Sequence, residues 1–91
     1  MAAKALAIEA APFGIRVNTV CPGAVETDLF RSGIEAAPDA QAAYEAVRAR
    51  YALRRIAGPP EIAAAILWLT STESSYVTGA AIAVDGGRTF H

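Results

Sequence analysis

Residues 14–27 read GIRVNTVCPGAVET, and this stretch decides the fold. Branched apolar residues alternate with polar ones over residues 15–20, a pattern typical of a β-strand. Pro22-Gly23 predicts the turn that ends this strand, because both residues favour turns. Beyond the turn we expect a short helical turn over Asp28 to Ser32, which Gly33 ends. The stretch is therefore a strand that runs through a loop into a helix.

Helices are expected on both sides of this strand. Composition predicts one over Ala2 to Ala11, and Pro12 with Gly14 ends it because proline cannot continue the helical hydrogen-bond ladder. A second helix is predicted over the alanine-rich run that follows Pro38, with Asp39 as its N-cap.

The third helix, after Gly58, carries the strongest apolar stripe in the chain. Pro59 or Pro60 fits its first turn, and Glu61 suits the positive end of the helix dipole. The stripe consists of Ile62, Ile66, Leu67 and Leu69. We expect three of these residues to face a sheet and Trp68 to remain available for a partner; the three are Ile62, Ile66 and Leu69.

A second strand is predicted over Val77 to Val84, after a polar connector from Ser71 to Ser75 and before the turn Asp85-Gly86-Gly87. A strand, a helical crossover and another strand imply a parallel pair with a right-handed connection. Parallel sheets are normally larger and covered on both faces, so we expect this unit to complete a sheet whose other strands lie elsewhere.

Composition excludes several classes of function. The 91 residues are 54% hydrophobic and 19% charged with a net charge of −1, so the chain offers no basic stripe and we expect no nucleic-acid partner. The longest apolar run, Ile62 to Leu69, is too short to span a membrane. Glu9 interrupts the apolar run near the N-terminus, which argues against a secretory signal. The lone Cys21 fits a reducing compartment, and we expect a cytoplasmic protein.

Four segments occur in the order and spacing of one known family. They are GIRVNTVCPGAVET at 14–27, LRRIAGPPEIA at 53–63, YVTG at 76–79 and VDGG at 84–87. Together they resemble the short-chain dehydrogenase/reductase family over nearly the whole chain except Phe30 to Ala52. One such motif alone is a weak signal, but four in register are a strong one.

This resemblance implies an α/β fold in which residues 1–91 form the C-terminal segment of a single, incomplete domain. They would supply the last two strands of a Rossmann-like parallel sheet, with their crossover helices. It also implies an oxidoreductase that uses NAD or NADP and interconverts a small-molecule alcohol and a carbonyl by hydride transfer. We expect a homo-oligomer.

The resemblance further implies that one loop walls the nicotinamide, and its cofactor-binding residues are Pro22, Gly23, Ala24, Val25 and Thr27. The backbone around Val25 would pair with the carboxamide, and the Thr27 hydroxyl would add a hydrogen bond. The residues alone also allow an ordinary strand-ending turn, with Thr27 as an N-cap of the next helix. Both interpretations stay open.

We expect no catalytic residue within these 91 residues. The sequence holds neither a glycine-rich phosphate loop nor a Tyr-x-x-x-Lys motif. Tyr44-x-x-x-Arg48 and Tyr51-x-x-x-Arg55 imitate that spacing, but arginine is a different hydrogen-bonding partner from lysine. We interpret both pairs as helix packing with a solvated charge, and expect the isolated chain to be inactive.

No metal site is expected either. Asp85 is interpreted as a turn residue and His91 as part of a frayed tail. The alternative to an enzyme segment is a non-catalytic remnant that acts as an oligomerisation module. Exposed surfaces at Ile62, Leu67 and Trp68, or an uncovered strand edge at Val17, would favour that alternative.

Overall fold

The computed structural model describes residues 2–88. Its two strands are separated along the chain by helices, as in an α/β fold. In chain order the elements are α1 (Ala2–Ala10), the 3-10 turn η1 (Ala11–Phe13), β1 (Thr19–Pro22), α2 (Asp28–Glu35), α3 (Ala40–Arg48), α4 (Pro59–Thr70), the 3-10 turn η2 (Thr72–Ser74) and β2 (Ala81–Val84). No helix in this part of the chain reaches the length and apolar character needed to cross a membrane.

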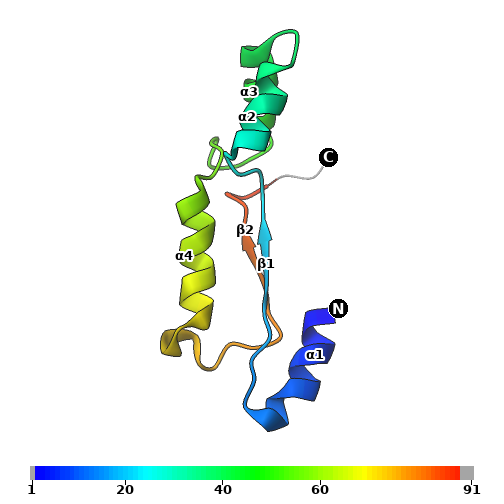
Figure 1. Cartoon of the computed structure of the whole chain (residues 1–91), viewed down its shortest axis with the longest axis vertical. Helices are drawn as coiled ribbons and strands as arrows, with labels where there is room; N and C mark the ends of the chain where they lie inside the picture. The colour runs from blue at the N-terminus through cyan, green and yellow to red at the C-terminus, as the bar shows by residue number, and fades with distance from the viewer. Residues whose placement is uncertain (1, 89–91) are drawn as a thin grey trace.

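The sheet is the parallel pair that the sequence predicts. β1 and β2 pair in register from Thr19 opposite Ala81 to Pro22 opposite Val84. Both arrows point the same way in Figure 1, so the two strands end at the same edge, next to α2 and α3. This carboxyl edge is where open α/β sheets bind their ligands.

Both strands are shorter than predicted. The Arg16 guanidinium links the last turn of α4 to the chain after it, because it donates to the carbonyl oxygens of Leu69 at 2.9 Å and of Val77 at 3.0 Å. Asn18 donates to the Val77 carbonyl and accepts from the Ala80 N–H. Over the first half of each predicted strand these side-chain bonds take the place of most of the ladder, although the Gly79 N–H still donates to the Val17 carbonyl at 2.7 Å. The paired register begins at Thr19.

Most helix boundaries agree with the sequence. Gly14 ends the first helical segment in a left-handed conformation, with φ of 72°. The Asp39 side chain accepts from the Ala42 N–H, so the predicted N-cap of α3 is confirmed. The predicted end of the preceding helix is wrong, because α2 continues through Gly33 to Glu35. A glycine inside a helix costs only about 1 kcal/mol, which the continued hydrogen-bond ladder outweighs.

The core is small and α4 is only partly covered. Among the described residues, the buried apolar side chains are Ala7, Tyr51, Ile56 and Leu69. Ile66 and Leu69 share the lining of a hollow with Val20, so both face β1 as predicted. Ile66 nevertheless remains 49% exposed. The helix faces the strand without filling the space between them.

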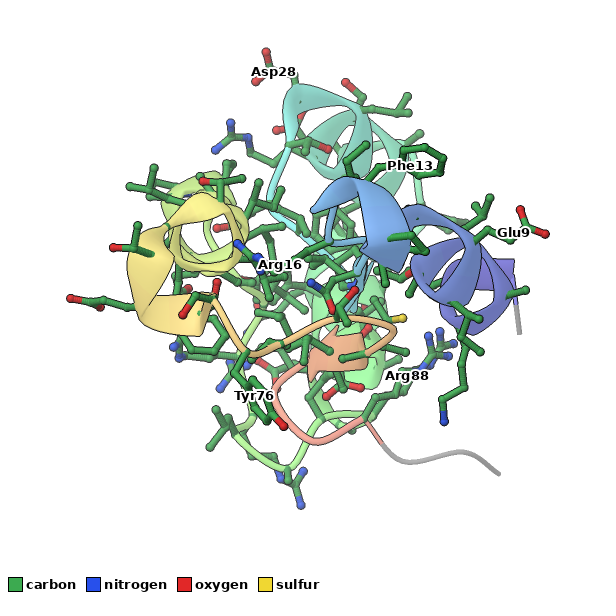
Figure 2. The ribbon with its side chains drawn as sticks, turned by 90° about the horizontal axis from the view of Figure 1, so that it is seen from below. Glu9, Phe13, Arg16, Asp28, Tyr76 and Arg88 are labelled. Carbon is green, nitrogen blue, oxygen red and sulfur yellow. The ribbon has the colours of Figure 1, made fainter. Side chains whose placement is uncertain are left out.

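Several other apolar side chains point away from the body. Figure 2 shows Phe13 on η1 and Tyr76 after η2 projecting outward, while Arg16 lies between the helical segments. Phe13 and Tyr76 are among the most exposed large hydrophobic residues.

The predicted polar connector Ser71 to Ser75 contains η2. Its Ser74 is buried, and the Ser74 hydroxyl donates to carbonyls at the end of α4.

Candidate nicotinamide-facing loop

The five predicted site residues lie on the loop that leaves β1 at the carboxyl edge. The Gly23 N–H donates to the Val84 carbonyl at 3.4 Å and so extends the sheet by one step. Val25 then forms an isolated parallel bridge with Ala57. In this bridge the Glu26 N–H donates to the Ala57 carbonyl at 2.8 Å. The loop is therefore fixed to β2 at its start and to the segment before α4 at its end.

Tyr51 contacts the start of this loop. Its side chain is buried, and its hydroxyl accepts a hydrogen bond from the Ala24 N–H at 2.8 Å. A β-carbon on Gly23 would lie 2.7 Å from Tyr51 Cε1, so only glycine fits beside the ring. Interpreting Tyr51 as a helix-packing residue is wrong, because it lies beyond the end of α3 at Arg48. Nothing in the sequence spacing pairs it with residues 27 positions away.

One backbone donor of the loop has no hydrogen-bond acceptor within residues 2–88. Within residues 23–27, every amide N–H except that of Val25 donates a hydrogen bond. The pairs are Gly23 to the Val84 carbonyl, Ala24 to the Tyr51 hydroxyl, Glu26 to the Ala57 carbonyl and Thr27 to the Val25 carbonyl. The Val25 N–H finds no acceptor among the described residues, and it remains available to a ligand.

Thr27 is the N-cap of α2, as one of the two interpretations held. Its hydroxyl oxygen accepts from the Phe30 N–H at 3.1 Å, and its backbone is extended. A hydroxyl that accepts one bond still carries a hydrogen of its own to donate. The cap therefore leaves the Thr27 hydroxyl, which is exposed, able to bond a further acceptor.

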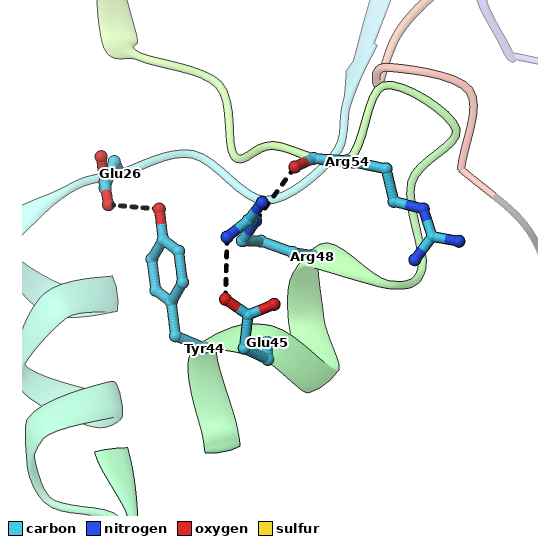
Figure 3. Close-up of polar contacts among 5 residues, drawn as sticks. All are labelled: Glu26, Tyr44, Glu45, Arg48 and Arg54. Atoms are coloured by element: carbon cyan, nitrogen blue, oxygen red, sulfur yellow. Dashed lines mark hydrogen bonds and ion pairs between the residues drawn. The ribbon is translucent and has the colours of Figure 1, made fainter. Parts of the chain in front are cut away.

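Tyr44 and Arg48 lie on α3 and are both engaged (Figure 3). The Tyr44 hydroxyl donates to Glu26 Oε1 at 3.0 Å. Desolvation by burial and this hydrogen bond to Glu26 raise the pKa of Tyr44. Arg48 donates to Glu45 at 2.8 Å and to the Arg54 carbonyl at 3.0 Å. The pair ties α3 to the loop and to the chain before α4.

Arg55 is not paired with Tyr51. It forms two hydrogen bonds with the Glu61 carboxylate, at 2.7 Å and 2.6 Å. This contact, with a hydrogen bond from the Gly58 N–H, lowers the pKa of Glu61 to about 2. Asp85 accepts from the Gly87 N–H, so its turn role is confirmed. His91 lies outside the described residues.

A hollow of about 240 Å³ lies near the loop but does not enclose it. Of the five predicted site residues only Ala24 lines it, while Pro22 and Thr27 are exposed. The hollow is lined by Ala24, Tyr51, Leu53, Arg55, Ala57, Glu61 and residues 83–87. The loop thus forms an open wall that carries the free Val25 N–H, and it does not enclose a cavity.

Known proteins resemble the chain over almost its full length. The family model described as "Enoyl-(Acyl carrier protein) reductase" matches residues 1–89. "Short-chain dehydrogenase anuF" of Penicillium roqueforti is 45% identical over 94% of this chain and 30% of its own length. "3beta-hydroxysteroid dehydrogenase 1" of Eggerthella lenta is 42% identical over 100% of this chain and 33% of its own.

Solved structures agree in sequence and in shape. A short-chain dehydrogenase family protein from Francisella tularensis matches with a TM-score of 0.84 and 40% identity, over 93% of this chain and 37% of that one. YwfH, described as an NADPH-dependent reductase involved in bacilysin biosynthesis, matches with a TM-score of 0.86 and 34% identity, over 99% and 36%. The chain spans about a third of the length of the curated relatives it matches. It belongs to the short-chain dehydrogenase/reductase family, and its two strands are part of that family's Rossmann fold.

Proposed function

We propose that residues 22–27 form the wall that binds the nicotinamide of NAD or NADP in an oxidoreductase that interconverts an alcohol and a carbonyl. The observation that carries this proposal is the unpaired Val25 N–H at the carboxyl edge of the sheet. The relatives of this chain are dehydrogenases and reductases, and YwfH is described as NADPH-dependent.

The donors of the loop match the chemistry of a carboxamide. That group has one carbonyl acceptor and two N–H donors, so it needs partners of both kinds. The Val25 N–H suits the carboxamide oxygen. The Thr27 hydroxyl has a hydrogen to donate and lone pairs to accept, so it suits either end of the carboxamide. Two such contacts on a fixed loop would hold the ring in one orientation.

The role of this chain in the reaction is to bind and to orient. When bound, the nicotinamide cofactor supplies or accepts the hydride. The 91 residues contain no Tyr-x-x-x-Lys motif. The hydroxyls of Tyr44 and Tyr51 both form hydrogen bonds with the loop. We assign no proton transfer to any of them.

The test is Thr27→Val in an intact enzyme, with Thr27→Ser as its matched control. A chimera of YwfH that carries residues 1–91 in place of its equivalent segment provides a full-length protein. Thr27→Val should raise the Kd of NADPH several-fold, because one hydrogen bond is worth about 0.5–1.5 kcal/mol. Thr27→Ser should not. An unchanged Kd with a lower melting temperature would make Thr27 a helix cap and nothing more.

A second candidate function is a non-catalytic oligomerisation module. It is favoured by Leu67 and Trp68 on α4, which are 72% and 43% exposed. The backbone at Val17 does not add to this, because its N–H bonds Thr78 Oγ1 and its carbonyl bonds the Gly79 N–H. The state of association of the isolated chain tests this candidate.

A further inference from the structure

We propose that Tyr51 is a positioning residue whose hydroxyl holds the Ala24 amide and thereby aims the neighbouring Val25 N–H at the nicotinamide carboxamide. The proposal rests on the proposed function of the loop. It assigns to Tyr51 a contact with the loop and none with substrate or cofactor.

Tyr51 is rigidly held on its own side. The residue is 5% exposed, and the two residues after it bond the turn that follows β2. The Ala52 N–H donates to the Gly87 carbonyl at 2.9 Å, and the Leu53 N–H donates to the Gly86 carbonyl at 3.0 Å. The Tyr51 hydroxyl is therefore held in place by a backbone segment that is bonded to the turn at the carboxyl end of β2.

The hydroxyl fills a gap in the backbone pairing of the loop. At Gly23 the N–H still bonds β2, and at Glu26 it already bonds Ala57. The N–H of Ala24 falls between these two partners and bonds only the Tyr51 hydroxyl. Without that oxygen, a half-buried amide would lose its acceptor, so the loop would shift to solvate it.

Two contacts on Ala24, one from Tyr51 and one from Ala57, together set the direction of the Val25 N–H. The Ala24 carbonyl and the Val25 N–H belong to one planar trans peptide unit and point in opposite directions. The carbonyl accepts from the Ala57 N–H at 3.3 Å, so the Val25 N–H points away from the segment that contains Ala57. Tyr51 bonds the N–H of Ala24, the residue with which this peptide unit begins.

Tyr44 holds the other side of Val25, but through a side chain. Its hydroxyl bonds the Glu26 carboxylate and not a backbone amide (Figure 3). The Glu26 amide is already held by Ala57. Removing the Tyr44 hydroxyl should therefore disturb the Val25 amide less than removing that of Tyr51, which makes Tyr44→Phe a matched control.

The experiment compares Tyr51→Phe and Tyr44→Phe in the chimera of YwfH with residues 1–91. The two ligands are NADPH and phospho-ADP-ribose, which is NADP without its nicotinamide. Tyr51→Phe should raise the Kd of NADPH about three- to ten-fold, the range expected for one hydrogen bond. It should leave the Kd of phospho-ADP-ribose unchanged. In the free protein, Tyr51→Phe should speed up amide hydrogen exchange over residues 23–27. Tyr44→Phe should change each of these values by less than about two-fold.

Several results would overturn the proposal. An unchanged Kd of NADPH in Tyr51→Phe would do so. An equal rise in the Kd of NADPH and of phospho-ADP-ribose would also do so, because it would mark Tyr51 as merely structural. An equal effect of Tyr44→Phe would show that the Ala24 amide is not the point of control. The proposed function fails separately, if Thr27→Val leaves the Kd of NADPH for the chimera unchanged. In that case the exchange rates still decide whether Tyr51 holds the loop.

Discussion

At Gly23 the loop has no room for a side chain. A β-carbon there would lie 2.7 Å from the Tyr51 ring and 3.3 Å from the Asp85 Cα atom. The first neighbour is a side chain, which can be shortened, whereas the second is backbone, which cannot. The two contacts therefore contribute separately to the cost of any larger residue at this position.

Gly23→Ala should lower the free energy of unfolding of the chimera by about 1–3 kcal/mol, the usual cost of overpacking. Combined with Tyr51→Leu, which is itself destabilising, the loss should be smaller than the sum of the two single losses, because the shorter side chain relieves the clash with the ring while the backbone contact with Asp85 persists. Gly33→Ala is the matched control, since no atom lies within 4 Å of its added β-carbon. Inside α2 that change should raise stability by about 1 kcal/mol. Urea denaturation measures all of these variants, and additive losses from Gly23→Ala and Tyr51→Leu would contradict the clash.

At this scale the sequence predicts local contacts well and distant ones poorly. Thr27 and Asp39 are recognised as caps because each bonds an amide three residues ahead. The contact of Tyr51 with Ala24 crosses 27 positions, and no periodicity relates the two residues. The chain between them runs out through α2 and back through α3, and only this fold brings the two residues together. The residue that shapes the site is therefore missing from the set predicted from the sequence.

Among the elements, α4 begins at an ion pair that also serves as its cap. The Glu61 carboxylate accepts from the Gly58 N–H at 2.9 Å and from both terminal nitrogens of Arg55. Gly58 has no side chain that could cap the helix in return. The single carboxylate therefore satisfies a backbone donor, faces the positive end of the helix dipole and binds the chain before the helix.

The effect of Glu61→Gln on stability should depend on pH. In the folded protein the pKa of Glu61 falls from its ordinary value of 4.5 to about 2. The ionised carboxylate therefore adds stability that is fully present above pH 4.5 and is lost as the pH falls towards 2. Urea titrations of the chimera should show unaltered protein more stable than Glu61→Gln at pH 6 and equal to it below about pH 2. A difference that stayed constant over that range would contradict the ionic origin.

The strands show where periodicity misleads at the scale of an element. Alternation over residues 15–20 counts Arg16 and Asn18 as solvent-facing side chains of a strand. Arg16 instead bonds the Leu69 carbonyl in the last turn of α4, and Asn18 bonds the Val77 carbonyl beyond that helix. A cation near the carbonyl end of a helix is physically favourable, but the sequence does not reveal which helix end is near. The element type is predicted correctly, and its first residues are not.

The whole molecule is extended, with α2 and α3 projecting beyond the sheet (Figure 1). Its radius of gyration is 16.4 Å, whereas a compact domain of this length is expected at about 12 Å. Its accessible surface is 6497 Å², against about 5000 Å² for a folded protein of this mass. The sequence predicts this incomplete burial, because two parallel strands alone cannot cover both faces of their sheet.

The isolated 91-residue chain should therefore not behave as a well-packed monomer. Leu67, Trp68 and Phe13 expose apolar surface, and the hollow between Ile66 and Val20 is unfilled. At micromolar concentration, sedimentation should show oligomers or aggregates, and near-ultraviolet circular dichroism should show no fixed signal from Trp68. The chimera is the control, because the rest of its domain is available to cover these faces. A single sharp monomer with a strong Trp68 signal and cooperative melting would show that residues 1–91 fold independently, and would remove the main support for the oligomerisation module.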